Sequence, residues 1–211
     1  WIKNYKGKVI DILSESNQTY DFIISCIGND DDLKEITSIG KGCLDSVKEK
    51  TIFIDHSTVS PGIVREVEKN LKNLGVSFLD APISGGQAGA EKGQLSIMIG
   101  GSEEAYEKSI EILELYGKKI KYMGPSGSGQ LTKIINQICI AGLVQGLSES
   151  IYFMKQTDLN PDDVLEVISS GAAQSWQMDN RFKSMVAGEF DFGFAVDLMR
   201  KDLSIAFAEA D

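Results

Sequence analysis

The sequence is poor in the side chains that bind metal ions. It has one histidine, His56, and three cysteines, Cys26, Cys43 and Cys139, among 211 residues. Because zinc sites need three or four converging ligands and the cysteines show no CxxC spacing, no metal site is expected. An odd number of cysteines without a secreted framework predicts buried thiols in a reducing compartment, so the expected location is the cytoplasm.

The chain also lacks an excess of positive charge and a long apolar run. Its formal net charge is -10 and its pI is near 4.7, which opposes binding to a phosphate backbone. A small anionic substrate stays compatible with this charge if a few cations lie at its site. The longest apolar run, residues 134–147, contains amides and is shorter than the roughly 20 residues of a membrane span. Neither a nucleic-acid nor a membrane partner is therefore expected.

The first part of the chain has the pattern of an α/β domain. Between residues 20 and 123, short apolar runs alternate with segments of helical periodicity, which indicates βα units and a parallel sheet. We expect strands at residues 21–27, 51–55, 76–80, 95–100 and 119–123, a weaker strand at 8–12, and helices at 31–49, 61–74 and 103–116.

After Gly124 the strand signals stop. We expect helices at residues 127–156, 161–169, 177–187 and 196–210, and the segment GPSGSG (124–129) allows a sharp change of direction before them. The sequence thus predicts an α/β fold: a Rossmann-type parallel-sheet domain at residues 1–124, followed by an all-α domain at residues 125–211 that begins with a long interdomain helix. Both domains look incomplete, the first at its start and the second at its end.

Ser84, Gly85 and Gly86 follow a predicted strand directly. Ligands of parallel α/β sheets bind at the carboxyl ends of the strands, where we expect these residues to lie. Two adjacent glycines leave backbone N–H groups accessible to a carboxylate, and the Ser84 hydroxyl adds a donor. A plain tight turn would explain the glycine pair equally well.

Lys133 lies one turn inside the long predicted helix. The segment around it is not a phosphate-binding loop, because Gln130 stands where the GxxxxGK[ST] motif requires lysine. Lys133, Asn136 and Gln137 share one helix face by spacing. A lysine can exchange a proton with substrate, and a neighbouring amide can hold the substrate oxygen or the ammonium. The alternative is a solvated polar face.

Two other polar features have simpler interpretations. His56 ends a predicted strand and titrates near neutrality, which permits a general-base role, but only Asp55 is an evident partner. The acidic run at residues 30–32 begins a predicted helix, where negative charge interacts favourably with the helix dipole. We interpret this run as helix capping.

Three segments together resemble the β-hydroxyacid dehydrogenase family, which includes 3-hydroxyisobutyrate dehydrogenase, tartronate semialdehyde reductase and glyoxylate/succinic semialdehyde reductase, and more distantly 6-phosphogluconate dehydrogenase. DAPISGGQAGAEKGQLSIMIGG (80–101) resembles the family's substrate motif, GSGQLTKIIN (127–136) its catalytic-lysine motif, and RKDLSIA (200–206) a late motif on the cofactor side. The motifs occur in the family's order, and the resemblance extends from Tyr20 onward.

The resemblance implies an NAD- or NADP-dependent oxidoreductase that transfers hydride between nicotinamide and a small β-hydroxyacid or semialdehyde. Lys133 would be the general acid/base, and the substrate would be bound by Ser84, Gly85, Gly86, Asn136 and Gln137. The cofactor would contact Ile27, Gly28, Thr58 and Lys201. His56 would have no role, and the protein would assemble as a homodimer or homotetramer through the helical domain.

The chain departs from the family pattern in two places. Many members have asparagine both three and four residues after the lysine, whereas this chain has Asn136 and then Gln137, which leaves the substrate open. The family's first strand, GxGxxG turn and helix do not occur in the sequence, and we expect them to precede Trp1. Two alternatives share the fold, an imine reductase and a non-catalytic cofactor-binding module. Both would be expected to lack the lysine, so Lys133 disfavours them.

Overall fold

The computed structural model describes residue 7 and residues 20–38, 47–191 and 193–210. The chain divides into two compact units, residues 1–133 and 134–211, here called the sheet unit and the helical unit. The division falls inside helix α5 (Ser128–Met154) rather than at the predicted joint of residues 124–129. The reason is that the first residues of α5 bond to the strand ends of the sheet unit.

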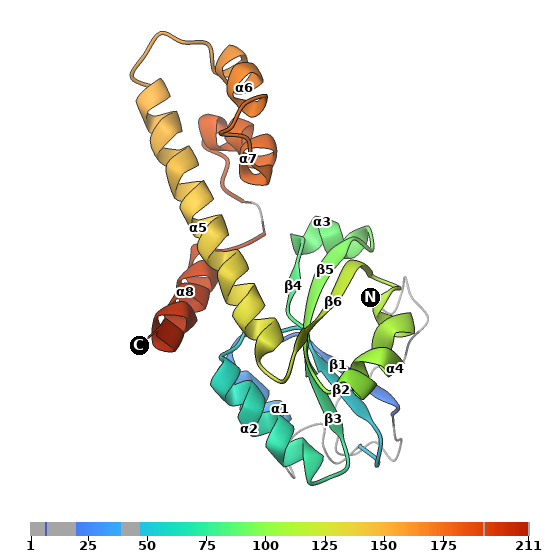
Figure 1. Ribbon diagram of the computed structural model, residues 1–211. Coiled ribbons are helices and arrows are strands. Elements are labelled where there is room, and N and C mark those ends of the chain that lie inside the picture. Colours follow the sequence, from blue (N-terminus) through green and yellow to red (C-terminus); the bar gives the residue numbers. More distant parts are fainter. Residues whose placement is uncertain (1–6, 8–19, 39–46, 192, 211) are drawn as a thin grey trace. The chain divides into compact units, whose positions relative to one another are not determined.

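The sheet unit contains six strands and four helices before α5 among its described residues (Figure 1). The strands are β1 (Phe22–Ser25), β2 (Ile52–Asp55), β3 (Ser77–Asp80), β4 (Ile83–Ser84), β5 (Leu95–Gly101) and β6 (Gly117–Gly124). The helices are α1 (Asp30–Ile36), α2 (Pro61–Lys72), α3 (Gly86–Glu91) and α4 (Glu103–Leu113). The sequence analysis missed β4 and α3, which are the shortest strand and the shortest helix among the described residues.

The sheet is mixed rather than wholly parallel. Its strand order is β1-β2-β3-β5-β4, with β6 also paired to β5. The pairs β1–β2, β2–β3 and β5–β6 are parallel, but β5 is antiparallel to both β3 and β4. A parallel crossover needs about a dozen residues or more, usually including a helix that packs on the sheet. Residues 81–94, between β3 and β5, form β4 and α3, a helix of six residues of which none is buried. No crossover helix therefore packs on the sheet in this interval, and β5 runs antiparallel to β3.

The two faces of this sheet have separate hydrophobic cores. Phe53 packs with residues of α1 and α2, whereas its neighbours Ile52 and Ile54 pack with residues of α4. This division follows from the alternation of side chains along a strand. Helix α2 begins at Pro61 behind the N-cap Ser60, as the sequence predicted, and it buries an apolar stripe against the first core.

Helix α1 is shorter than expected. It begins after the N-cap Asn29, whose side chain accepts bonds from the N–H groups of Asp31 and Asp32, and it ends at Ile36 instead of residue 49. The hydroxyl of Thr37 donates to the carbonyl of Leu33 and so competes with continuation of the helix. Residues 39–46, including Cys43, and the strand predicted at residues 8–12 lie outside the described residues.

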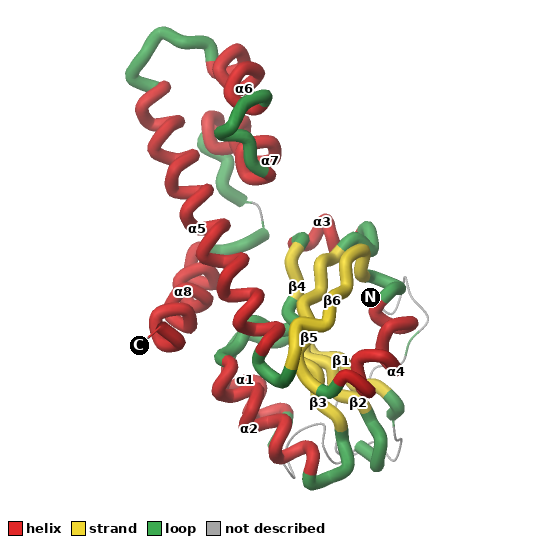
Figure 2. Tube along the Cα trace, viewed as in Figure 1, coloured by secondary structure: helices red, strands yellow, loops and turns green. Residues whose placement is uncertain are grey.

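The described residues of the helical unit contain only helices (Figure 2). After the main length of α5 come α6 (Pro161–Ser169), α7 (Trp176–Ala187) and α8 (Val196–Ala210). Asn160 and Ser175 cap α6 and α7. Leu147, Ile151, Met154, Met178 and Phe182 form its core. By length and composition alone, helix α5 could cross a membrane. Core helices of soluble proteins can meet the same two criteria, so this finding is weak evidence.

Candidate functional site

The loops that follow β1 and β2 are bonded to each other at the carboxyl ends of these strands. The Ser57 hydroxyl accepts a 2.8 Å bond from the N–H of Ile27 and donates a 2.7 Å bond to Asp55, which also accepts from Ser25 at 2.6 Å. Burial raises the pKa of the Asp55 carboxyl, although these hydrogen bonds oppose the shift. The structure thereby brings Ile27 and the loop that carries Thr58 to one edge of the sheet.

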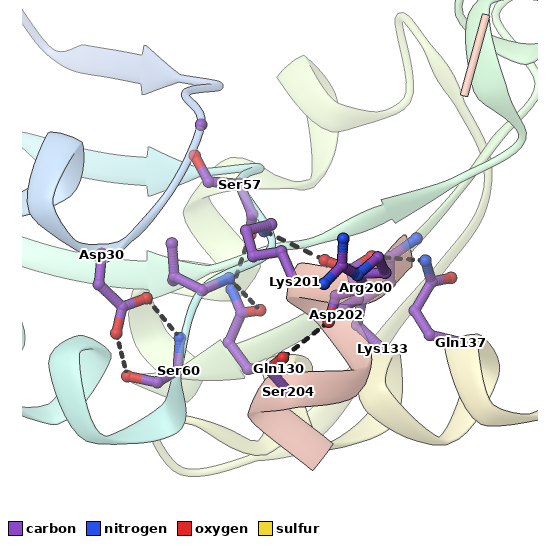
Figure 3. Close-up of polar contacts among 12 residues, drawn as sticks. Asp30, Ser57, Ser60, Gln130, Lys133, Gln137, Arg200, Lys201, Asp202 and Ser204 are labelled. Atoms are coloured by element: carbon purple, nitrogen blue, oxygen red, sulfur yellow. Dashed lines mark hydrogen bonds and ion pairs between the residues drawn. The ribbon is translucent and has the colours of Figure 1, made fainter. Parts of the chain in front are cut away.

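Gly28 and the first turn of α1 complete this edge. The Gly28 N–H donates to Asp32 at 3.1 Å, and an added Cβ at Gly28 would lie 2.6 Å from the same carboxylate oxygen. Asp30 accepts bonds from both the N–H and the hydroxyl of Ser60, at 2.9 and 2.5 Å (Figure 3). The acidic run therefore begins α1 as predicted, but Asn29 is the cap and the run forms the first turn. One of its members, Asp30, also holds the loop after β2.

Gln130, in the first turn of α5, bonds to the same loop. Its side chain is fully buried, its oxygen accepts from the Val59 N–H at 3.2 Å, and its nitrogen donates to the Ser57 carbonyl at 2.8 Å (Figure 3). The sequence analysis used Gln130 only to reject a phosphate loop. Its position in the first turn of an apolar helix was the available signal that its side chain is bonded inside the protein.

Asp80, the last residue of β3, joins the sheet to the start of α5. Its carboxylate accepts bonds from the N–H groups of Gly127 and Gln130, both at 2.9 Å. Burial raises the pKa of this carboxyl to about 6, against the lowering effect of its backbone hydrogen bonds. Gly129 has no room for a side chain, because an added Cβ would lie 2.5 Å from the Met98 carbonyl oxygen and 2.6 Å from that of Asp80.

Lys133 is held against strand β4. Its Nζ donates a 2.8 Å hydrogen bond to the carbonyl of Ile83, and only 8% of the residue is exposed. A solvated face is therefore the wrong interpretation of this lysine. The residue that follows Ile83 is Ser84, so the structure brings Lys133 beside the start of the predicted substrate turn.

The turn of Ser84, Gly85 and Gly86 lies beyond the carboxyl ends of β1 to β3. Ser84 pairs with Ser96, whereas Asp80 pairs with Gly100, so at about 3.3 Å per residue Ser84 lies roughly 13 Å further along β5. Gly85 and Gly86 have φ angles of 132° and 61°, which favour glycine. No side chain caps α3, which begins here, so the first backbone N–H groups are available to a bound anion.

The predicted residues of the helical unit form a chain of side-chain contacts. Asn136 donates to Gln137 at 2.9 Å, and Gln137 donates to Asp202 at 2.6 Å. The second oxygen of Asp202 lies 3.1 Å from Nζ of Lys201. Asp202 is 2% exposed and was missed by the sequence analysis. Its place beside Lys201 in the RKDLSIA motif was the available signal.

His56 and the cysteines have no place in these clusters. One ring nitrogen of His56 bonds to the Ala81 carbonyl at 2.6 Å and the other to the Tyr116 hydroxyl at 2.9 Å, and burial lowers the pKa of the ring. Both nitrogens thus have structural partners, which argues against a general base. Cys26 and Cys139 are free as expected, but both are exposed, so the prediction of buried thiols is wrong for these two.

One hollow of the sheet unit lies apart from all of these residues. It measures about 590 Å³, and its lining comes from α4, the start of β6 and the turn between them: Tyr106, Ile110, Glu114, Gly117, Lys118, Lys119 and Ile120. Because none of the predicted site residues lines it, we do not assign it to the site.

Family models match nearly the whole chain. Residues 2–124 match the model described as the NAD binding domain of 6-phosphogluconate dehydrogenase. Residues 127–211 match the model described as NAD-binding of NADP-dependent 3-hydroxyisobutyrate dehydrogenase. Both parts of the chain therefore belong to NAD(P)-binding families, and the models leave the choice between NAD and NADP open.

Individual proteins that are similar to this chain support the same family assignment. An uncharacterized oxidoreductase of Shewanella frigidimarina is 47% identical over 100% of this chain and 72% of its own length. The 2-hydroxy-3-oxopropionate reductase of Escherichia coli is 33% identical over 95% of this chain and 69% of its own. The crystal structure of 3-hydroxyisobutyrate dehydrogenase from Salmonella typhimurium aligns with a TM-score of 0.81 at 26% identity, over 90% of this chain and 66% of that one.

The similarity thus covers both units and agrees with the order of motifs and with the Rossmann-type fold. This chain spans about two thirds of the length of its relatives. It belongs to the β-hydroxyacid dehydrogenase family of NAD(P)-binding oxidoreductases.

Proposed function

We propose that the protein transfers hydride between nicotinamide and a small β-hydroxyacid or semialdehyde, and that Lys133 is its general acid/base. The observation that carries this proposal is the placement of Lys133, which is buried and donates to the carbonyl of Ile83, directly before the turn of residues 84–86. A proton-transfer group and a carboxylate-binding turn are therefore neighbours within one unit. Both are required for a β-hydroxyacid, whose carboxylate is separated from its reacting carbon by one carbon atom.

The carboxyl ends of β1 and β2 fit a dinucleotide. Ligands of Rossmann-type sheets bind at this edge, and Ser57 fixes the backbone at Ile27. Gly28 is exposed at this edge, and an added side chain there would collide with Asp32. Ile27, Gly28 and Thr58 of the sheet unit would contact the cofactor, and for Lys201 the family motif alone supports such a contact. The bound nicotinamide would accept or supply the hydride.

Residues of the chain would then bind the carboxylate of the substrate and transfer the proton. The N–H groups of Gly85 and Gly86 and the Ser84 hydroxyl would orient the carboxylate. In oxidation the neutral amine of Lys133 would take the proton from the substrate hydroxyl as hydride leaves the adjacent carbon. In reduction its ammonium would return that proton to the carbonyl oxygen. Asn136, one helical turn further along α5, would help to position this oxygen.

The test compares the full-length enzyme with its Lys133→Ala variant. Both are assayed with NADH and NADPH against 2-hydroxy-3-oxopropionate, succinic semialdehyde and glyoxylate, and in the oxidative direction against 3-hydroxyisobutyrate. Because positioned acid–base groups contribute about 10²- to 10⁴-fold, kcat should fall by a factor in that range. The same panel identifies the substrate and the preferred cofactor.

A matched control is Lys155→Ala, which removes an exposed lysine just past the end of α5. Its kcat should equal that of the wild type. Near-normal turnover of Lys133→Ala on the best substrate would refute the role of the lysine. We further propose a cytoplasmic homodimer or homotetramer, which sedimentation of the full-length protein would test.

A further inference from the structure

Gln137 is the residue whose structural role differs most from its predicted one. It stands where many family members have a second asparagine, and its side chain is 2% exposed. Its amide nitrogen donates to Asp202 at 2.6 Å (Figure 3). Its amide oxygen accepts from Asn136 at 2.9 Å. Both polar ends of the side chain therefore have partners inside the helical unit, and a side chain that is only 2% exposed offers little surface to a substrate.

The direction of these bonds follows from the chemistry of Asp202. An ionised carboxylate only accepts hydrogen bonds, and the other oxygen of Asp202 forms an ion pair with Lys201. Gln137 must therefore present its nitrogen to Asp202 and its oxygen to Asn136. Asn136 must in turn present its nitrogen to Gln137. The carboxylate thus sets the orientation of two successive amides.

Asn136 still has polar atoms that could bind a ligand. Its side chain is partly exposed, and no hydrogen bond to its Oδ1 is recorded among the residues that the structure describes. An asparagine amide offers one carbonyl oxygen and two N–H groups, of which Gln137 engages one N–H. The oxygen and the second N–H are the groups with which Asn136 could meet a substrate.

We propose that Gln137 is a positioning residue, which Asp202 orients and which acts on the reaction only by orienting Asn136. The proposal rests on the function proposed above, and it removes Gln137 from the set of substrate ligands. The length of the Gln137 side chain then has a physical explanation, because it contacts Asp202 and Asn136 at once. An asparagine side chain is one methylene shorter than glutamine and could not span the same contacts to both Asp202 and Asn136.

The first experiment adds a negative charge to the Gln137–Asp202 pair. In the full-length enzyme, Gln137→Glu places a second carboxylate against Asp202, so the two repel and Asn136 loses its fixed orientation. Misplacement of about 1 Å can cost on the order of 10²-fold, so kcat/KM should fall by roughly ten- to hundredfold. In the Gln137→Glu/Asp202→Asn double variant, the new asparagine donates to the new glutamate, which still accepts from Asn136. Activity should return to within about threefold of Asp202→Asn alone.

This rescue separates positioning from substrate binding. If Gln137 donated a hydrogen bond to the substrate, a glutamate could not replace it, and the double variant would remain as impaired as Gln137→Glu. The midpoint of thermal unfolding, Tm, is measured for every variant. Recovery of Tm without recovery of kcat/KM would show that the pair only supports the fold, and it would overturn the proposal.

A second experiment avoids buried charge altogether. Gln137→Met and Asn136→Ala are made singly and together, and kcat and KM are measured for each. If Gln137 acts only through Asn136, the methionine should change kcat/KM by less than about twofold once Asn136 is alanine. Independent, multiplying losses would show a direct role for Gln137 and refute the inference. Lys133→Ala tests the proposed function separately. If this variant kept normal turnover, the role of Lys133 would be refuted, but the coupling measured between Gln137 and Asn136 would be unchanged.

Discussion

The two units hold their functional side chains in different ways. In the sheet unit, the polar groups bond mainly to backbone. Asp80 accepts from the N–H groups of Gly127 and Gln130, Gln130 bonds to an N–H and a carbonyl of the loop after β2, and Lys133 donates to a carbonyl of β4. In the helical unit, Asn136, Gln137, Asp202 and Lys201 bond to one another through side chains alone.

This difference affects how each part responds to substitution. A backbone partner has the same chemistry whatever residue occupies its position, so the sheet-unit bonds depend on a single side chain and on the path of the main chain. In a side-chain pair, both residues can be substituted together so that the contact is kept. We therefore expect substitutions in the sheet unit to reduce stability, and those in the helical chain to affect activity more and to be open to paired compensation.

The largest expected effect is at Gly129. A Gly129→Ala side chain would meet carbonyl oxygens at 2.5 and 2.6 Å, which are backbone atoms that cannot move aside. The free energy of unfolding, measured with urea, should fall by about 3 kcal/mol or more. The control is Gly146→Ala, further along α5, where nothing lies within 4 Å of the new Cβ. Because alanine favours helix more than glycine, this variant should be stabilised by up to about 1 kcal/mol.

The two glutamines of α5 offer a matched pair for the same comparison. Gln130→Met would leave the buried Val59 N–H and Ser57 carbonyl without their partner, and it should cost about 3 kcal/mol of unfolding free energy. Gln137→Met leaves Asp202 its ion pair with Lys201, so it should cost only about 1 kcal/mol. Equal losses in urea denaturation would argue against the distinction between the two units.

An effect smaller than those at Gly129 and Gln130 is a pH dependence at Asp80. Its folded pKa is raised from 3.8 to about 6, so the folded state binds this proton more tightly than the unfolded state does. The wild type should therefore gain stability relative to Asp80→Asn as the pH falls through 6, by about 1.4 kcal/mol between pH 7.5 and pH 5. The difference between two urea titrations isolates this carboxyl from Asp55, and a constant difference would contradict the raised pKa.

The order of elements could be predicted because each leaves a local pattern. The long helices of the second half were found almost residue for residue, since Pro161 and the caps Asn160 and Ser175 mark their starts. The direction of β5 was not found. The apolar run that makes it a strand is the same for either direction, and the antiparallel pairing depends on whether a crossover helix packs on the sheet between β3 and β5.

The candidate site was predicted in part for a similar reason. Ser84, Gly85, Gly86 and Lys133 belong to continuous motifs, so their residue types and spacing were visible. Asp80, Gln130 and Asp202 act through partners distant in sequence: the bonds from Asp80 to Gln130 and from Gln137 to Asp202 join residues 50 and 65 positions apart. No local pattern reports such a pairing.

By itself the sequence determined the class of the protein and the chemistry open to it, because alternating periodicity, glycine pairs and one lysine in an apolar helix are properties of short segments. Only the tertiary structure decided that Lys133 is buried against β4 rather than solvated, and that Gln137 is bonded at both ends. Burial and hydrogen-bond partnership depend on which distant segments pack together, and these fix what a polar side chain is able to do.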